Sequence, residues 1–150
     1  MQTIITLAGI ALFIVAAYGD VKSFRIPNLL VAAIALLAVV RLVAIGDPSV
    51  ALYTVGTSLA VLSIGFVLFA LGYIGGGDAK LIAAATLLIG YRDLYSFLVF
   101  MCICGGIMSI VVFAARRKTK SKLYVPYGVA IATAGGVTLF FQTPFHSFIG

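Results

Sequence analysis

Long apolar runs separated by short polar links dominate the pattern along this chain. The stretches without Asp, Lys or Arg cover residues 1–19, 26–40, 48–77, 81–91, 94–115 and 123–150. Most approach or exceed the roughly 20 residues that cross a hydrocarbon core about 30 Å thick. The pattern therefore predicts an all-α membrane protein. Its second run extends to Ile45 if the long side chain of Arg41 snorkels toward the nearer interface.

The fourth run is short for a full crossing, so crossing and re-entry are alternatives. Cytoplasmic loops of membrane proteins concentrate Lys and Arg. If the fourth run crosses, Lys22, Arg25, Lys80 and the cluster Arg116 to Lys122 all lie on one face. If it re-enters, that cluster lies opposite Lys22 and Arg25. We therefore predict six transmembrane helices in a single domain, residues 1–150, with both termini outside, on the periplasmic side.

Composition and charge narrow the class of protein further. Hydrophobic residues make up 63% of the chain and the mean hydropathy is +1.24, which excludes an ordinary soluble domain. The formal net charge of +6 suits anionic lipids. Nucleic acid is the weaker interpretation, because the basic residues lie in short loops between apolar runs. The N-terminal run has no cleavage pattern and is expected to be a retained helix.

Small and aromatic residues suggest how the helices pack and where they end. The pairs Gly105 and Gly106, and Gly135 and Gly136, are expected to let helices approach closely. Cys102 and Cys104 are two residues apart in an apolar run, so they are expected to pack and not to form a disulfide or a zinc site. All seven tyrosines fall near predicted helix ends, where an amphipathic ring prefers to lie.

Two aspartates share the predicted cytoplasmic face. Asp20 ends the first run and Asp78 begins the fourth. Taken singly, either acid could be solvated at the membrane boundary, and Asp78 could be a helix N-cap. Their surroundings favour chemistry. Pro27 suits the first turn of the second helix, and Gly75, Gly76 and Gly77 permit unusual dihedrals and leave clearance for an extended peptide.

A pair of converging carboxylates has a definite chemical use. In a partly dry site the two cannot easily both ionise, so one holds a proton while the other acts as a base toward water. An aspartic protease needs this arrangement. The pair shares its titration, so the sequence leaves open whether Asp20 or Asp78 is the base.

Several motifs of the chain resemble the type IV prepilin peptidases, which are intramembrane aspartyl proteases with a G-x-G-D motif. "GGGDAKL", from Gly75, carries that motif, and Asp20 with the later "IPN" resembles the first catalytic motif. "VPYGVAIATAGG", from Val125, is similar to the last helix of the family. The resemblance implies that Asp20 and Asp78 are catalytic. It implies substrate-binding or loop roles for Gly75, Gly76, Gly77, Lys80, Pro27, Asn28, Pro126, Tyr127 and Gly128.

The resemblance also implies a reaction and a place in the cell. It predicts a peptidase of the bacterial inner membrane that cuts prepilins, which carry a basic leader, after a glycine at the cytoplasmic boundary, with no metal or cofactor. Only nine residues, Gly19 to Pro27, separate the first two runs. The cysteine-containing cytoplasmic insertion of the larger members is absent there, so the chain looks like the short branch associated with Flp/Tad pili. Nothing in the sequence indicates a methyl-donor pocket.

A second class of protein fits the composition. A small transporter or a pilus-assembly subunit could use Asp20 and Asp78 to relay protons or bind a cation. Such sites are expected near mid-membrane in repeated halves, whereas these acids fall at helix ends. Lys22, Arg25 and the Arg116 to Lys122 cluster are expected to bind lipid phosphates, while Lys80 fits either a lipid or a catalytic role. His146 is expected to be an interfacial polar residue.

Overall fold

The computed structural model describes residues 2–23, 26–118 and 127–142, and within them the chain is helical with no strand. The prediction of an all-α protein with six helices is confirmed. The elements are α1 (Gln2–Ser23), α2 (Asn28–Ile45), α3 (Pro48–Ala70), α4 (Gly76–Ile89), a 3₁₀ turn η1 (Tyr91–Asp93), α5 (Leu94–Lys118) and α6 (Tyr127–Gln142).

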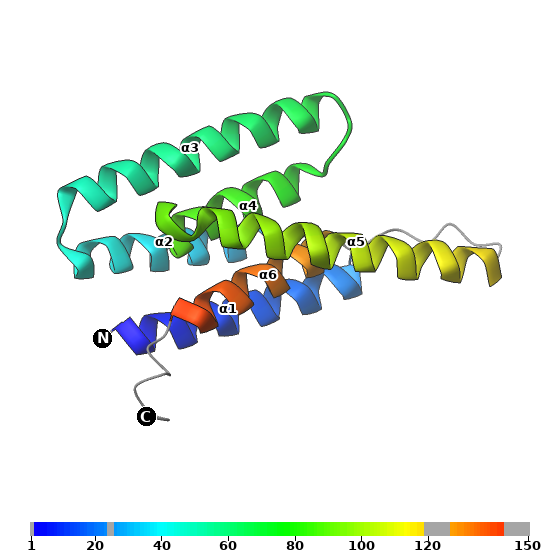
Figure 1. Ribbon diagram of the computed structural model, residues 1–150, viewed down its shortest axis with the longest axis horizontal. Helices are drawn as coiled ribbons and strands as arrows, with labels where there is room; N and C mark the ends of the chain where they lie inside the picture. The colour runs from blue at the N-terminus through cyan, green and yellow to red at the C-terminus, as the bar shows by residue number, and fades with distance from the viewer. Residues whose placement is uncertain (1, 24–25, 119–126, 143–150) are drawn as a thin grey trace.

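The six helices alternate in direction along the bundle (Figure 1). The starts of α1, α3 and α5 therefore lie at the same end as the ends of α2, α4 and α6. The fourth run forms a single helix antiparallel to α3, as the crossing alternative requires, and does not turn back on itself. Which end faces the cytoplasm stays a prediction.

Helix length divides the bundle into two groups. Among the described residues four helices are long and apolar enough to cross a membrane: α1, α2, α3, and α5 taken with η1. The other two are shorter, with 14 residues in α4 and 16 in α6. At 1.5 Å per residue α4 rises about 21 Å, which is less than the hydrocarbon thickness of about 30 Å.

The short helix α4 forms the centre of the structure. It packs against α2, α3 and α6, and α1 and α5 pack in turn against α6. Its alanines keep it narrow, so that its neighbours approach closely. The largest fully buried apolar side chains come from five of the helices: Phe13, Ile34, Leu81, Leu88, Phe97 and Leu139. The core of the protein therefore surrounds the helix that begins at the glycine-rich motif.

Close packing uses some of the expected glycines and not others. A Cβ at Gly135 would lie 2.6 Å from the ring of Phe13, so this glycine is needed for the contact between α6 and α1. A Cβ at Gly105 would meet the Cβ of Ala130 at 4.0 Å. Gly106 and Gly136 have no such neighbour within 4 Å, so the prediction was wrong for these two. Each faces away from the adjacent helices.

Helix α3 contacts α4 through small and polar residues. A Cβ at Gly65 would lie 3.1 Å from the Cβ of Ala79. The hydroxyl of Ser58 donates a 2.8 Å hydrogen bond to the backbone carbonyl of Ala83. Thr54 is fully buried, and its hydroxyl has no hydrogen-bond partner in the described structure. The contact between α3 and α4 thus contains one satisfied and one unsatisfied hydroxyl.

Replacing Thr54 by valine is expected to leave the protein as stable as the wild type or more stable, by up to about 1 kcal/mol. The change removes a buried polar group that makes no hydrogen bond, at little cost in shape. Ser58→Ala is the matched control and is expected to lower stability by about 1 kcal/mol, because it removes a bond that is made. Thermal unfolding in detergent measures both. A Thr54→Val variant less stable than Ser58→Ala contradicts the assignment of an unsatisfied hydroxyl.

Candidate active site

Four segments meet at the end of the bundle where α1 ends and α4 and α6 begin (Figure 1). They are the last turn of α1, the link before α2, and the first turns of α4 and α6. Asp20 contacts Gly128 across the interface of α1 and α6, and Gly77 lies against Ile26, two residues before α2 begins. Segments far apart in the sequence are therefore joined into one site, and both predicted catalytic aspartates belong to it.

The side chain of Asp20 lies on the N-terminus of α6. Its carboxylate accepts hydrogen bonds from the backbone N–H of Val129, at 3.2 Å, and of Gly128. Only 5% of Asp20 is exposed. A Cβ at Gly128 would lie 2.7 Å from the Cγ and Oδ2 atoms of Asp20, so only glycine leaves room for the carboxylate here. Asp20 thus binds the free amides of a helix that begins more than 100 residues later.

The carboxylate of Asp78 lies on the start of its own helix. Asp78 is the third residue of α4 and precedes the apolar part of that helix, which begins at Leu81. It accepts a hydrogen bond from the backbone N–H of Gly75. The alternative interpretation of Asp78 as the N-cap is wrong, because Gly75 occupies that position. The side chain instead reaches back from the third helical position, as the acidic partner of a capping box does.

The two carboxylates act on each other electrostatically. Desolvation of the half-buried side chain and the negative charge of Asp20 raise the pKa of Asp78 from 3.8 to about 6, although the bond from Gly75 opposes the shift. An effect of one charge on the other requires that they lie close together in a poorly hydrated place. The arrangement therefore favours a state in which Asp78 holds a proton over part of the mildly acidic range.

The glycine motif is packed more closely than its sequence suggested. A Cβ at Gly75 would lie 2.9 Å from Oδ2 of Asp78, and one at Gly76 would lie 3.2 Å from the ring of Phe69. The expectation of unusual dihedrals there was wrong. Gly75 is extended at φ −73°, and the positive φ of +80° occurs earlier, at Gly72. The absence of a side chain at Gly75 makes room for the carboxylate of Asp78, and clearance for a substrate stays a prediction.

Other predicted site residues lie around the same end. Pro27 is the N-cap of α2 and not part of its first turn, since the helix begins at Asn28. The Nζ atom of Lys80 donates to Oδ1 of Asn28 at 3.4 Å, which links the first turns of α4 and α2. Tyr127 opens α6 and is 49% exposed. Their roles toward a substrate stay predictions.

Some predicted residues lie outside the described part of the chain. They are Arg25, residues 119–122 of the basic cluster, Tyr124, Pro126 and His146. The two cysteines are described as free, with Cys102 exposed and Cys104 half-buried on α5. Among the described residues no group of three or more His, Cys, Asp or Glu side chains could hold a metal ion.

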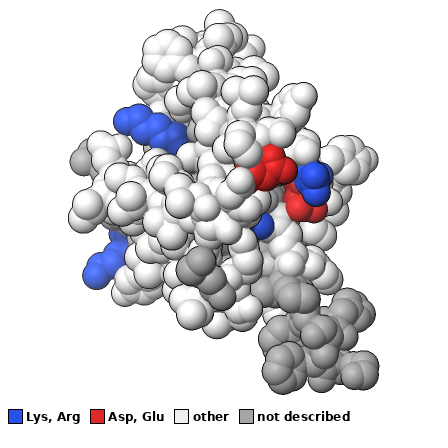
Figure 2. Space-filling view, turned by 90° about the vertical axis from the view of Figure 1, so that its left-hand side faces the viewer, with Lys and Arg blue, Asp and Glu red and all other residues white. Residues whose placement is uncertain are grey.

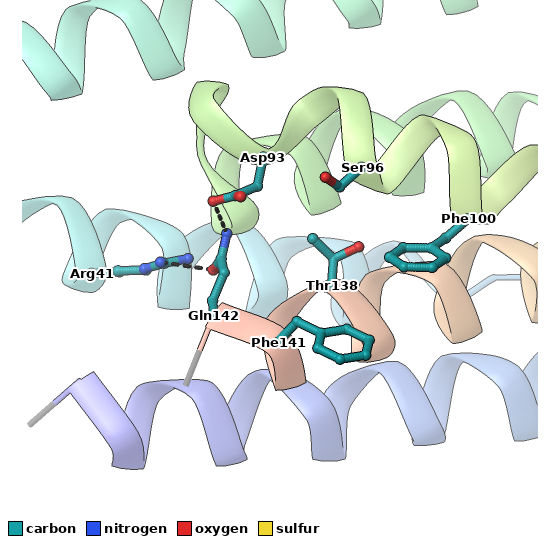
Figure 3. Close-up of a pocket in the computed structure, with 7 residues that line it drawn as sticks. All are labelled: Arg41, Asp93, Ser96, Phe100, Thr138, Phe141 and Gln142. Carbon is teal, nitrogen blue, oxygen red and sulfur yellow. Dashed lines mark hydrogen bonds between the residues drawn. The ribbon is translucent and has the colours of Figure 1, made fainter. Parts of the chain in front are cut away.

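A second polar cluster occupies the opposite end of the bundle (Figure 3). The guanidinium of Arg41 donates to the carbonyls of Leu88 and Ile89, at the end of α4, and at 2.9 Å to Oε1 of Gln142. Nε2 of Gln142 donates to Ile89 and, at 2.6 Å, to Asp93. The expectation that Arg41 snorkels was wrong. Its side chain turns inward because the last carbonyls of α4 have no partners within the helix.

A pocket of about 530 Å³ opens beside this cluster, lined by Arg41, Asp93, Ser96, Phe100, Thr138, Phe141 and Gln142 (Figure 3). Figure 2 faces this end of the molecule and shows acidic side chains next to a basic one on its surface. Arg92 is exposed there and interacts electrostatically with Asp47 and Asp93. Because the Arg41 donors already bind protein carbonyls and Gln142, this cluster stabilises the ends of α4 and α6.

One functional contact had no signal in the sequence. Val129 holds Asp20 through its backbone N–H, which every residue except proline carries, so no residue type marks the position. Gly128 was expected to contact substrate, and the structure places it against Asp20. A conspicuous feature in the sequence was Pro126, directly before the first residue of α6. A helix start offers free amides, but its acceptor is fixed only by packing.

Fold and site together define a class: a polytopic helical membrane protein with two coupled carboxylates at one end of its bundle. The sequence model of the type IV leader peptidase family matches residues 7–110, which include Asp20 and Asp78. The chain belongs to this family.

Two curated relatives show how far the similarity extends. Both are named prepilin leader peptidase/N-methyltransferase, from two strains of Burkholderia pseudomallei, 1026b and K96243. Each is 32% identical over 77 residues, which is 51% of this chain. The match spans only 25% of the length of either relative. No solved structure matches the chain.

Proposed function

We propose that this protein is an aspartic endopeptidase of the bacterial inner membrane that removes the leader peptide of Flp-type prepilins. Cleavage follows a glycine at the cytoplasmic boundary, and Asp20 and Asp78 activate the attacking water. Membership of the type IV leader peptidase family supports prepilin processing. The motif resemblance and the absence of an insertion between α1 and α2 support the Flp branch.

The observation that carries the proposal is the placement of Asp20, in the last turn of α1, and Asp78, in the first turn of α4, at the same end of the bundle, where the charge of Asp20 raises the pKa of Asp78. These residues are 58 positions apart and lie on different helices, and both fall within the residues that the family matches. Carboxylates that repel each other in a poorly hydrated site are costly for a fold. Catalysis by one ionised and one protonated carboxyl group is a reason for such a pair to occur.

The reaction would use the pair as a general base and a general acid. One carboxylate takes a proton from the bound water as its oxygen attacks the scissile carbonyl, and the other gives a proton to the carbonyl oxygen. Both act from the first or last turn of a helix, so their backbones are held in place. The reacting atoms would then lie at the membrane boundary, where water is available.

The substrate is expected to approach from the cytoplasm. A prepilin has a basic leader, a glycine and an apolar segment that continues into the membrane. The exposed Tyr127 and Lys80 lie beside the carboxylates and could contact the extended segment around the scissile bond. Lys22 and Lys80 are exposed cations on this face and are expected to bind anionic lipids as well.

Co-expression with a prepilin tests the proposal. A small protein with a basic leader, a glycine and an apolar helix is chosen from the same genome and produced with and without this chain. The expected result is a shorter product whose N-terminus begins directly after the glycine, as shown by mass spectrometry. A pilin with a bulky residue in place of that glycine is the control and should stay uncut. Full-length pilin in the presence of well-expressed protein contradicts the proposal.

A further inference from the structure

The two carboxylates of the site are held by different numbers of backbone amides. Asp20 accepts from two, those of Gly128 and Val129, in the first turn of α6. Among the described residues Asp78 accepts from one, that of Gly75. Each carboxylate also lies at the positive end of a helix dipole, that of α6 for Asp20 and that of α4 for Asp78, so the number of amides is what distinguishes the two. Asp20 is 5% exposed, so water screens its bonds to these amides little, and the two amides partly offset the desolvation of its charged form.

We infer that Asp20 is the ionised member of the pair and the general base, that Asp78 carries the proton and is the general acid, and that Gly128 is the positioning residue that fixes this division. The assignment of a general base and a general acid rests on the proposed function. The location of the proton is a property of the protein without substrate and does not depend on the proposed function. Gly128 acts because any Cβ there would push the carboxylate of Asp20 off the amides of α6.

With Asp20 as the base and Asp78 as the acid, the protons of the reaction balance. Asp20 takes a proton from water as the water oxygen bonds to the carbonyl carbon, and Asp78 gives its proton to the carbonyl oxygen, which leaves a neutral diol. Asp20 then gives its proton to the amide nitrogen as the C–N bond breaks, and Asp78 takes a proton from the diol. The products are an amine and a carboxylic acid, and both aspartates return to their starting states.

Several other ionisable residues lie on the turns around the pair. The ionisable residues described on the adjoining turns are Tyr18 and Lys22 on α1, Tyr73 in the turn before α4, Lys80 on α4 and Tyr127 on α6. Lys22 lies over the ring of Tyr18, 5.9 Å from its centre, and Lys80 binds Asn28. The charge of Asp20 raises the pKa of Asp78.

Carbon-13 labelling of aspartate tests the location of the proton without any substrate. The chain has four aspartates, so the labelled protein in detergent gives four carboxyl resonances, assigned by single Asp→Asn variants. The resonance lost in Asp78→Asn is expected to titrate at a higher pH than the one lost in Asp20→Asn. The reverse order overturns the inference, whether or not the protein cleaves prepilins. Failure of cleavage with the expected order overturns only the proposed function.

Gly128→Ala tests the positioning role, with Gly136→Ala as its matched control on the same helix. A Cβ at Gly136 meets nothing within 4 Å. Gly128→Ala is expected to lower the processing rate by about 10²-fold, the scale of a 1 Å misplacement. Its Asp20 resonance should titrate closer to that of Asp78, whereas Gly136→Ala should change neither measurement. An unaltered Asp20 titration in folded Gly128→Ala overturns the positioning role. If Gly128→Ala does not fold, the titration of the two aspartate resonances in the wild-type protein still decides which aspartate carries the proton.

Discussion

Replacing either Asp20 or Asp78 by asparagine is expected to reduce prepilin processing by about 10²-fold or more. Asparagine preserves the size of the side chain and can still accept a backbone hydrogen bond, but it can neither take nor give the proton that the reaction needs. The measurement is the fraction of a co-expressed prepilin that is shortened, read on immunoblots at matched protein levels. The double variant should process as much prepilin as the less active of the two single variants, because the two groups act as a unit.

Asp47→Asn is the matched control for these variants. Asp47 lies at the other end of the bundle, is exposed, and caps α3 through bonds from Ser49 and Val50. Asparagine is as good an N-cap, so processing and stability should stay near those of the wild type. Full cleavage by Asp20→Asn or Asp78→Asn contradicts the dyad. Intact cleavage with a lost proton flux would instead favour the relay alternative.

The pH dependence of stability shows whether Asp78→Asn still folds. Because the pKa of Asp78 is raised to about 6, the folded protein binds a proton between about pH 4 and 6 that the unfolded chain releases. The free energy of unfolding of the wild type should therefore fall as the pH rises through this range. Asp78→Asn should lack this decline and be at least as stable at neutral pH. A variant that is inactive yet more stable separates catalysis from folding.

Arg41→Met is expected to lower the free energy of unfolding by about 2–4 kcal/mol, because it leaves buried acceptors at the end of α4 and on Gln142 without donors. Methionine keeps much of the length and the apolar stem of the side chain, so the loss reflects the guanidinium. Thermal unfolding in one detergent measures it. The end of α4 should also exchange its amide hydrogens faster than in the wild type.

Arg92→Met is the matched control for Arg41. Arg92 is exposed, and its guanidinium lies over the ring of Tyr91, 5.7 Å from the ring centre. Exposed charges of this kind contribute little to stability, so a change of less than about 0.5 kcal/mol is expected. Equal losses in the two variants contradict the view that Arg41 acts through the helix end.

The helices of this fold were predictable because lipid imposes a simple rule on the sequence. A segment that crosses a membrane must be apolar and satisfy its own backbone, so runs free of charge mark helices directly. Charge placement also selected a single fourth helix over a re-entrant one. The boundaries were less certain. The third run continued to residue 77, whereas α3 ends at Ala70 and the chain turns at Leu71 and Gly72.

Contacts between distant segments were not predictable in the same way. The sequence marked Asp20, Asp78 and Gly128 as site residues, but the binding of Asp20 to the first turn of α6 depends on how α1 and α6 pack. Apolar periodicity is weak in helices that face lipid on one side and protein on the other, so it does not fix their rotation. Arg41 was misjudged for a related reason. Its inward direction depends on the early end of α4, which only the structure reveals.

The shortness of α4 has a consequence for how the protein responds to its membrane. α4 is enclosed by α2, α3 and α6, and the carbonyls of Leu88 and Ile89 at its end accept hydrogen bonds from Arg41 and Gln142. Bilayers that differ in thickness are accommodated by tilting of helices that contact lipid. The outer helices α1, α2, α3 and α5 can take up that adjustment while α4 keeps its place within the protein. The glycine motif and Asp78, at the other end of α4, are thereby insulated from changes in lipid composition.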